Sequence, residues 1–266
     1  MNQPLPSISI VTPSYNHGRF IDRTIQTVLN QSLPPVEYRV MDGGSTDETI
    51  AILKKYSDRL QWVSEKDKGQ ADAIDRGFRQ CTGDIISWLN SDDRFANENV
   101  LKRVAEAFAA DATVDIVYGD GELIDLDGHS FRQSRGAAVK QAKELLILPA
   151  GFALQPAIFF RRQLYLDAGG IDGRFFGAFD YDLWLRMFAK ARRVTYLPEV
   201  LAQATCHPDA KSVKGMWRLI GELVEIKRKN ERPFALTWLE RIRMRINVLG
   251  LYAYYVAVRT GLRRAV

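Results

Sequence analysis

The chain has 266 residues, of which 46% are hydrophobic and 26% charged, and its formal net charge is +5 at pH 7. This composition excludes the low hydrophobicity and high charge of a disordered chain and is typical of a folded globular protein. A chain of this length buries a sizeable core, so we expect one α/β domain over residues 1–210 and an appended segment over residues 211–266.

The cysteines and the N-terminus bear on the compartment. Cys81 and Cys206 are the only cysteines. Without metal-site spacing or disulfide density they indicate a reducing compartment, although one bridge between them stays open. The opening stretch MNQPLPSISIV lacks the basic start and long apolar run of a secretory signal. The chain has no run of about twenty apolar residues, which is the length that spans a bilayer. We therefore expect a cytoplasmic protein.

In the first half of the chain, short β-branched runs alternate with stretches of helical period. The runs predict strands at residues 8–12, 37–41, 61–64, 85–89 and 116–118. The helical stretches cover residues 20–29, 50–56, 71–78 and 100–108. Ser45 or Thr46 is expected to cap the second of these helices. The alternation predicts a Rossmann-like, mostly parallel sheet with helices on both faces, in which ligands bind beyond the carboxyl ends of the strands.

After residue 120 the alternation weakens. We expect a hairpin around residues 121–128, a strand at 157–160 and a helix at 181–189. From about residue 213 apolar residues repeat at threes and fours, and a last helical segment at 236–262 follows Pro233. The second half is therefore mixed, and it ends in a C-terminal helical extension.

Lysines and arginines crowd into this extension, at residues 227–229, 241–245 and 259–264. Because the rest of the chain is near neutral, we expect the tail to meet an anionic surface. The aromatic residues beside the arginines suit a helix lying on anionic lipid. They are Trp238, Tyr252, Tyr254 and Tyr255. A helix packed on the domain or in a homodimer explains the apolar residues equally well. We expect no nucleic-acid partner, because no binding motif accompanies the charge.

Polar residues follow three of the predicted strands, at residues 13–18, 42–47 and 90–93. The carboxyl ends of parallel strands share one edge of a sheet, so these residues should converge on one rim. Asp92 and Asp93 suit a divalent cation there, because hard carboxylate oxygens hold such ions and a diphosphate leaving group needs its charge neutralised. The alternative is that residues 90–93 only form a turn, which Asn, Ser and Asp favour.

Five segments give a more specific indication. They are SISIVTPSYN at 7–16, VMDGGSTDET at 40–49, DKGQADAIDRGF at 67–78, ISWLNSDD at 86–93 and FDYDLWLR at 179–186. In this order they resemble the motifs of family 2 glycosyltransferases, a large inverting family. The resemblance implies a GT-A fold, a nucleotide diphosphate sugar as the donor, and Mn²⁺ or Mg²⁺ as the cofactor.

The resemblance also implies roles for the rim residues. Asp42 would recognise the nucleotide base, with Pro13 and Tyr15 as the wall of the base pocket, and Asp92 and Asp93 would hold the cation. The other residues implied to bind the nucleotide sugar, together with Asp92, are Lys68, Gly69, Asp72, Asn90 and Ser91.

Two further positions bear on the cation. Asn90 stands where the family has its first acidic residue, and it offers a carbonyl oxygen without charge, so metal affinity is expected to be weaker. His207 stands where many members of the family place another metal ligand, and imidazole can serve as one. The alternative for His207 is a structural role.

Asp180 and Asp182 open the predicted helix that also carries Trp184. Transfer to a hydroxyl needs a base to accept its proton. By resemblance Asp180 is that base, although Phe179 replaces the Glu of the family, and Asp182 is its competitor. Two residues apart on a helix they should not share one face, and helix capping is the alternative for both. Gln155 and Trp184 are expected on the acceptor side.

These indications predict an inverting glycosyltransferase of bacterial cell-surface polysaccharide or glycolipid synthesis. It would act on a glycan or lipid-linked acceptor, in the cytoplasm or at the cytoplasmic face of the inner membrane. One rival is a sugar-phosphate nucleotidyltransferase, although no glycine-rich loop with a basic residue lies near the N-terminus. Another is a non-catalytic nucleotide-sugar binder, which Asn90 and Phe179 make conceivable. A dinucleotide-binding dehydrogenase is excluded, because no Gly-x-Gly-x-x-Gly follows the first strand.

Overall fold

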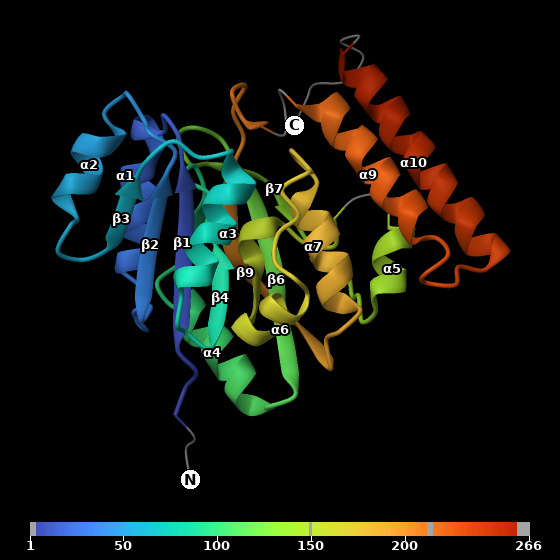
Figure 1. The fold of residues 1–266 in the computed structure, drawn as a ribbon, viewed down its shortest axis with the longest axis horizontal. Coiled ribbons are helices and arrows are strands. Elements are labelled where there is room, and N and C mark those ends of the chain that lie inside the picture. Colours follow the sequence, from blue (N-terminus) through green and yellow to red (C-terminus); the bar gives the residue numbers. More distant parts are fainter. Residues whose placement is uncertain (1–3, 149–150, 212–214, 260–266) are drawn as a thin grey trace.

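The computed structural model of the chain describes residues 4–148, 151–211 and 215–259, with side chains as far as residue 253. A twisted sheet lies at the centre with helices against it, and the last two helices, α9 and α10, lie together at one side of the molecule (Figure 1). The expected α/β class with a C-terminal helical extension is confirmed.

The described strands form one mixed sheet. In spatial order they are β3 (Gln61–Ser64), β2 (Glu37–Asp42), β1 (Ile8–Ser14), β4 (Ile85–Trp88), β8 (Ile158–Arg161), β6 (Val114–Ile124), β9 (Arg193–Thr205) and β5 (Arg94–Phe95), with β7 (Ser130–Ser134) paired to β6. The first four of these are parallel, as is the pair β6–β9. Strand β8 runs antiparallel to both β4 and β6. Strands β5 and β7 also pair antiparallel, with β9 and β6 respectively. The sheet thus has a parallel half, β3 to β4, and a mixed half in which β8 is inserted near the centre.

Helices cover both faces of the sheet. They are α1 (Gly18–Leu29), α2 (Thr49–Lys55), α3 (Gln70–Gln80), α4 (Val100–Ala110), α5 (Ala142–Ile147), α6 (Arg162–Asp167), α7 (Phe179–Phe188), α9 (Met216–Asn230) and α10 (Trp238–Arg259), with a short 3₁₀ turn η1 (Gln155–Ala157). Each strand-flanking helix forms because its apolar residues recur at helical spacing. In α1, for example, Ile21, Ile25 and Val28 are all buried.

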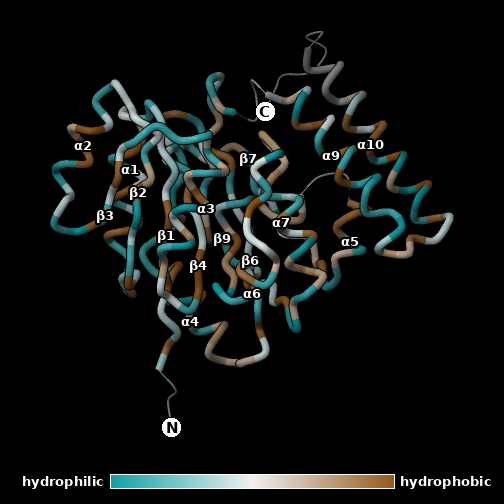
Figure 2. The backbone as a smooth tube through the Cα atoms, viewed as in Figure 1, coloured by the Kyte–Doolittle hydropathy of each residue, from teal (hydrophilic) through white to brown (hydrophobic). Residues whose placement is uncertain are grey.

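The core is divided by the sheet into two clusters. Successive strand residues point to opposite faces, so Ile85 packs with α1 and α4 while Ile86 packs with α3 and α7. Hydrophobic segments accordingly run through the middle of the molecule and along the inner sides of the helices (Figure 2). The sheet is buried on both faces, which fixes the register of its strands and hence the positions of their carboxyl ends.

The expected cap of the second helix was wrong. Helix α2 begins at Thr49, and Asp47 Oδ1 accepts the Thr49 backbone N–H at 3.0 Å. Ser45 instead donates to the Asp42 carboxylate at 2.5 Å, and the backbone N–H of Thr46 donates to Asn16 at 2.9 Å. The Ser45 hydroxyl also accepts the Asn16 backbone N–H at 2.7 Å, so the oxygen that would have capped the helix joins two loops of the rim instead.

The C-terminal extension packs on the domain through α9. Lys227 is 1% exposed, and its ammonium donates to the carbonyls of Leu146 and Leu148 at 2.7 and 2.8 Å. Along the described residues no helix is long and apolar enough to cross a membrane. The Trp238 side chain is 73% exposed, whereas the side chains of Tyr254 and Tyr255 lie outside the described part.

Candidate functional site

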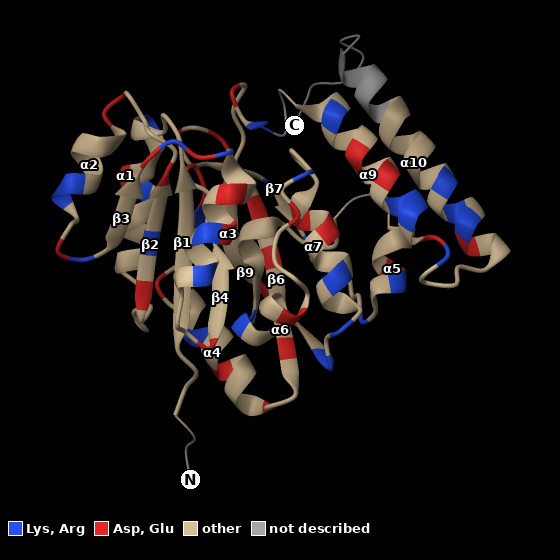
Figure 3. Ribbon diagram, viewed as in Figure 1, with Lys and Arg blue, Asp and Glu red and all other residues tan. Residues whose placement is uncertain are grey.

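The loops that follow β1, β2 and β4 meet at one edge of the sheet, as the alternating pattern predicts. Acidic residues gather at this upper edge, opposite the N-terminus (Figure 3). Asn16 joins the first two loops, because its backbone N–H donates to Ser45 Oγ at 2.7 Å and its Oδ1 accepts from Thr46. Its φ of 53° is the left-handed conformation that Asn tolerates better than most residues.

Asp42 ends β2 and is 2% exposed. Its Oδ2 accepts the backbone N–H groups of Gly44 and Ser45 at 3.1 and 2.8 Å and the Ser64 hydroxyl at 2.7 Å. Among the residues that the structure describes, its Oδ1 accepts only the Ser45 hydroxyl. A carboxylate offers about four acceptor positions, two on each oxygen, so Oδ1 retains room for one more donor. A base N–H is a donor of this kind.

Asn90 sits at the centre of a hydrogen-bonded network. Its amide nitrogen donates to Asp93 Oδ2 at 2.9 Å and to Gln155 Oε1 at 3.1 Å, and its oxygen accepts from Gln70 at 2.8 Å. Gln155 in turn donates to the Trp88 carbonyl at 2.8 Å. A carboxylate at position 90 could make neither donation. An asparagine suits position 90 because its amide nitrogen supplies the hydrogen-bond donors that Asp93 and Gln155 accept.

Asp92 and His207 come together from opposite ends of the domain. The imidazole Nε2 lies 3.0 Å from Asp92 Oδ2, and their side chains are 3% and 15% exposed. The His207 ring also packs against Phe20, with 4.8 Å between the ring centroids. A carboxylate and an imidazole are both ligands for Mn²⁺-like cations, so this pair fits a divalent ion whose other ligands come from substrate and water.

Asp93 does not fit the metal-binding role expected for it. It is buried, its Oδ1 accepts the Thr205 backbone N–H at 3.0 Å, and its Oδ2 accepts the Asn90 amide. Burial, together with the nearby Asp92 charge, raises the pKa of the Asp93 carboxyl. Its oxygens hold the loop against β9, so Asp92 is the carboxylate left to face a cation.

The remaining donor-side residues lie at the same rim. Pro13 is buried at the end of β1, whereas Tyr15 is 61% exposed and free to cover a flat ligand. Gly69 has φ 106°, and a Cβ there would meet no atom within 4 Å, so its backbone is open to a ligand. Lys68 is exposed, and its backbone N–H donates to Asp72 at 3.2 Å.

Ser91, another expected donor-side residue, is 1% exposed. The His17 ring contacts its hydroxyl, with 2.5 Å between Nδ1 and Oγ. Its backbone carbonyl accepts the Thr24 hydroxyl at 2.9 Å. Ser91 therefore fixes the loop that carries Asp92, and its hydroxyl is directed to His17.

Asp180 lies in the first turn of α7 and is partly buried. Burial raises the pKa of its carboxyl to about 6, against the opposing effects of the Tyr181 backbone N–H and the Lys211 charge. The Lys211 ammonium lies over the rings of Phe176 and Phe179, 4.3 and 5.2 Å from their centroids. Asp180 is thus a carboxylate able to take up a proton near neutral pH.

Lys211 also connects the two halves of the site. Its ammonium donates to Gln70 Oε1 at 2.9 Å, and Gln70 donates to Asn90. Burial lowers the pKa of Lys211 to about 8, although Asp180 opposes the shift. An unbroken chain of hydrogen bonds therefore runs from the end of the domain to the rim.

Glu222, from the C-terminal extension, binds the backbone just before α7. Its carboxylate accepts the backbone N–H groups of Phe176, Gly177 and Ala178 at 2.8, 2.8 and 3.0 Å. These groups would otherwise be unpaired donors just before the helix, where a negative charge is also favoured by the helix dipole. The extension therefore sets the position of Asp180.

Two expected site residues have structural roles. Asp182 is 8% exposed and pairs with Arg186 one turn further along α7, with 2.7 Å between Oδ2 and Nη2. Trp184 is 3% exposed and stacks on Trp88 with the ring planes 13° apart. Trp184 is therefore a core residue, which corrects the expectation that it lines the acceptor side. Gln155 lies in the rim network instead.

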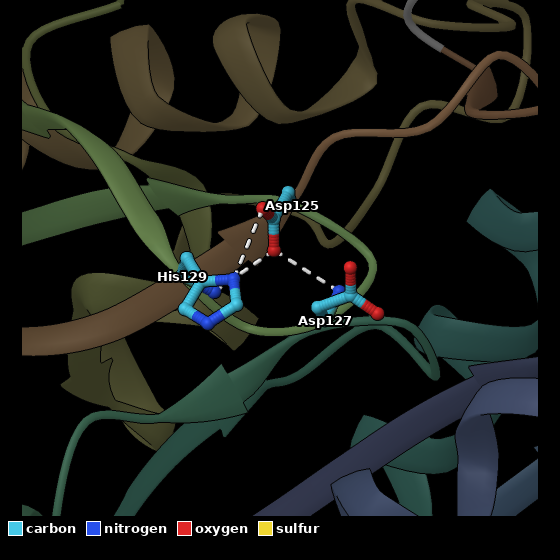
Figure 4. Close-up of side chains that lie close together, drawn as sticks. All are labelled: Asp125, Asp127 and His129. Carbon is cyan, nitrogen blue, oxygen red and sulfur yellow. Dashed lines mark hydrogen bonds and ion pairs between the residues drawn. The ribbon is translucent and has the colours of Figure 1, made fainter.

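A second acidic group lies on the turn between β6 and β7, where Asp125, Asp127 and His129 come close together (Figure 4). Asp125 Oδ1 accepts the backbone N–H groups of Asp127 and His129 at 3.0 and 2.8 Å. These are the hydrogen bonds of an Asx turn. The group is accounted for by the turn itself.

The sequence reasoning missed Gln70, Lys211 and Glu222. Gln70 lies in the segment DKGQADAIDRGF, but the donor-binding roles in that segment were assigned to Lys68, Gly69 and Asp72. Lys211 and Glu222 lie beyond the five segments, among many other charged residues. Only their contacts across the fold single them out.

Comparisons with known proteins identify the family of this chain. The sequence model of the family described as Glycosyl transferase family 2 matches residues 9–169. An uncharacterized glycosyltransferase of Mycobacterium tuberculosis is 30% identical over 228 residues, which is 82% of this chain and 84% of that protein. Chondroitin synthase of Escherichia coli is 25% identical over 79% of this chain, but the match spans only 30% of that longer protein.

Solved structures show the same fold. TarS residues 1–349 from S. aureus, in complex with UDP, has a TM-score of 0.62 at 21% identity, covering 92% of this chain and 80% of that one. The mannosyltransferase PcManGT from Pyrobaculum calidifontis, in complex with GDP-Man and Mn²⁺, has a TM-score of 0.63 at 20% identity, covering 96% and 76%. The fold is therefore of the GT-A type.

Proposed function

This chain belongs to glycosyl transferase family 2 and is a glycosyltransferase, and on that premise we propose that it moves a sugar from a nucleotide diphosphate sugar to an acceptor hydroxyl with inversion. The observation that carries the proposal is the pairing, on one fold, of a donor rim around Asp42 and Asp92 with a carboxylate, Asp180, whose pKa is raised to about 6. A non-catalytic binder has no need of such a group.

The donor half of the proposal rests on the strand-end loops. Asp42 keeps one acceptor position on Oδ1 for a base N–H, and the exposed Tyr15 ring is available to stack on the base. The open backbone at Gly69 precedes α3, whose N-terminus favours an anionic group such as a phosphate. TarS structures hold UDP and UDP-GlcNAc, and the mannosyltransferase holds GDP-Man. We extend nucleotide-sugar binding to this chain without naming the base.

Asp92 and His207 would hold a divalent cation, Mn²⁺ or Mg²⁺. When bound, the cation supplies charge neutralisation for the departing diphosphate. Asp92 contributes a carboxylate oxygen and His207 a ring nitrogen, and Phe20 packs against the imidazole and limits its rotation. Mn²⁺ is present in the mannosyltransferase complex.

In the transfer step, Asp180 would accept the proton of the acceptor hydroxyl as its oxygen attacks the anomeric carbon. The bond to the diphosphate breaks as the new glycosidic bond forms on the opposite face, which gives inversion without a covalent intermediate. Glu222 orients the first turn of α7, and Lys211 places a positive charge beside Asp180. Asp182 is the weaker candidate for the base, since Arg186 already pairs with it.

A donor screen tests this proposal. Nucleotide sugars on uridine and guanosine diphosphate, with and without Mn²⁺ or Mg²⁺, are added to the protein and its melting temperature is measured. A bound donor raises apparent stability by mass action, about 2.7 kcal/mol at a hundred times its dissociation constant. We expect one donor class to stabilise the wild type only with the cation. If no nucleotide sugar shifts the melting temperature, the proposal fails.

We further propose that residues 211–266 form a helical extension whose last helix contacts anionic lipid, as suits a lipid-linked acceptor in polysaccharide or glycolipid synthesis. Trp238, Ile242, Ile246 and Leu249 follow one another at spacings of four, four and three along α10 and are 73%, 36%, 60% and 66% exposed. They form one apolar stripe, because such spacings fall on one helix face. Leu239 widens it.

Arginines flank this stripe on both sides. Arg243 and Arg245 are exposed, and on a helical projection they fall on opposite sides of the apolar residues. In a symmetric dimer through this face, arginines would meet arginines and repel. An anionic membrane surface attracts both rows, so lipid is the occupant that the charges favour.

Vesicle sedimentation tests the lipid contact. The protein should bind phosphatidylcholine vesicles only when they contain phosphatidylglycerol, and Ile246→Glu should reduce that binding at least fivefold. Val36→Glu, at a 57% exposed position far from α10, is the matched control. Equal binding by both variants would contradict the contact. A concentration-dependent dimer that Ile246→Glu disrupts would assign the stripe to a second copy instead.

A further inference from the structure

A small cavity opens beside Asp92, away from the loops that follow β1 and β2. Its volume is about 180 Å³, room for a group the size of a phosphate and a few waters at about 30 Å³ per water. One wall is the first part of α1, and the others come from the loop after β4 that carries Asp92 and Asp93, the start of β5, the β6–β7 turn and the end of β9.

Three arginines line this cavity. Arg19 and Arg23 lie one turn apart on α1, and Arg94 reaches it from β5. In the described ranges none of the three forms an ion pair with a carboxylate: Arg19 lies over the Phe20 ring at 5.5 Å, and Arg23 makes only a long bond of 3.4 Å to the Leu126 carbonyl. Like charges one turn apart disfavour a helix unless an anion lies between them.

Arg94 is held in place by the turn beneath it. A Cβ at Gly128 would meet Arg94 Nη2 at 2.5 Å, so the guanidinium lies directly against that glycine. The fold therefore brings the positive charges of Arg19, Arg23 and Arg94 together around one cavity.

Two carboxylates also border the cavity, but neither forms an ion pair with the three arginines in the described ranges. Asp92 Oδ2 lies 3.0 Å from His207 Nε2, and Asp93 accepts from Asn90 and from the Thr205 backbone N–H. The Thr24 hydroxyl donates to the backbone carbonyls of residues 91 and 93. The three guanidinium groups are therefore left without a carboxylate partner among the described residues.

We propose that this cavity binds an oxyanion, a phosphate or carboxylate group, carried by the acceptor. Guanidinium groups match both anions because their N–H donors bond two oxygens side by side. The nucleotide base is assigned to the loops after β1 and β2, and the diphosphate to the cation at Asp92, which also borders the cavity. An anion of the acceptor must therefore bind while a nucleoside diphosphate fills the donor site. The proposal rests on the glycosyltransferase function and specifies that acceptors are acidic.

Binding of inorganic phosphate tests the cavity directly. Titration calorimetry is run on the full chain with Mn²⁺ and a saturating nucleoside diphosphate, UDP or GDP, which fills the donor site. Arg23→Gln with Arg94→Gln should weaken phosphate binding at least tenfold and leave nucleotide affinity within twofold. Arg59→Gln, an exposed arginine on another part of the surface, is the control. Gly128→Ala should also weaken phosphate, because it displaces Arg94 while keeping its charge.

If the wild type binds no phosphate under these conditions, or the double variant binds it equally well, the proposal is overturned. Circular dichroism melting shows whether each variant is folded, and Gly128→Ala and the arginine double variant provide independent perturbations. If the wild type bound neither UDP nor GDP, the proposed donor binding would fail while the phosphate result would stand, so the two failures are distinguishable.

A second arm identifies the source of the anion. Methyl glucuronide and methyl glucoside differ in a carboxylate, and their binding is compared by saturation-transfer NMR. An acceptor-borne anion predicts at least tenfold tighter binding of the glucuronide, competition by phosphate, and loss of the difference in the double variant. Equal binding of the two sugars, with phosphate bound alongside either, would overturn the acceptor assignment in favour of a free phosphate.

Discussion

Two carboxylates of the site, Asp42 at the end of β2 and Asp180 at the start of α7, differ in how many hydrogen-bond donors surround them. Asp42 accepts four hydrogen bonds from its own and neighbouring loops. Asp180 accepts the backbone N–H of Tyr181 at 2.6 Å, and burial raises its pKa to about 6. Donors to a carboxylate favour its charged form, whereas burial without them favours the protonated one.

The difference separates recognition from proton transfer. A carboxylate fixed by several donors presents one defined oxygen to a ligand, which is what base recognition requires. A carboxylate with few donors can take up a proton without breaking a network. The same residue type thus serves two purposes because the first half of the chain gives Asp42 two backbone N–H groups and two hydroxyls, whereas Asp180 in the second half is partly buried beside one backbone N–H.

Asp180→Asn is the substitution with the largest expected effect on this difference between the two carboxylates. We expect the transfer rate to fall on the order of 10²–10⁴-fold, because the base is lost, while the donor dissociation constant stays within about threefold. A transfer assay and calorimetry measure the two quantities on the same preparation.

Asp182→Asn is the control for that substitution. It removes the ion pair with Arg186, so we expect it to lower the free energy of unfolding by about 1–3 kcal/mol with a much smaller loss of transfer. Equal losses of transfer from the two substitutions would return Asp182 to consideration as the base.

Glu222→Gln tests whether the C-terminal extension positions Asp180. Burial raises the pKa of Glu222, but the N–H donors of Ala178, Gly177 and Phe176 and the Arg218 side chain together lower it below its ordinary value. The stabilisation is therefore present above pH 4.5 and lost as the pH falls through the lowered pKa. Urea unfolding should show the variant about 1–3 kcal/mol less stable at pH 7. The gap should narrow in acid; a gap independent of pH would contradict the capping role.

Asn90→Asp tests the rim network. The substitution removes both donations from the amide, to Asp93 and Gln155, and places two carboxylates side by side. We expect a loss of about 1–3 kcal/mol in stability without metal. Added Mn²⁺ should raise the melting temperature of the variant more than that of the wild type, since the cation then gains a charged ligand. An unchanged response to Mn²⁺ would place the cation away from position 90.

The smallest expected effect is on the pH profile. Asp180 must be ionised to act as a base, so kcat/KM should fall as the pH drops below about 6, the raised pKa. Lys211 lowers that pKa by its charge, and Lys211→Met should therefore move the acid limb to higher pH. Steady-state rates over the pH range measure the shift. An unchanged acid limb, or a shift to lower pH, would show that the Lys211 ammonium does not lower the pKa of Asp180.

Much of the fold could be predicted because its signals are local. The buried face of α1, at Ile21, Ile25 and Val28, is visible in the apolar spacing alone. The strand at residues 61–64 was located to the residue, and the convergence of the polar loops follows from parallel strand order. The family resemblance came from short segments read in order, and the family match over residues 9–169 confirmed it.

Other features depend on contacts between residues far apart in the sequence. The strand near residue 158 was expected, but its antiparallel insertion between β4 and β6 depends on pairings with both strands. Ser45 looks like a helix cap until Asp42 and Asn16 are beside it. Trp184 is expected on the acceptor side from its place in the sequence, but in the fold it stacks on Trp88 in the core.

By itself the sequence determined the elements, their mostly parallel order and the chemical class of the rim, because periodicity and turn residues act over a few positions. Only the tertiary structure decided what each carboxylate can do. Asp92 contacts His207, and the oxygens of Asp93 accept hydrogen bonds from Asn90 and Thr205. Asp180 is partly buried with few hydrogen-bond donors. The reason is physical: the availability of a carboxylate depends on its burial and its partners, and these partners come from distant parts of the chain.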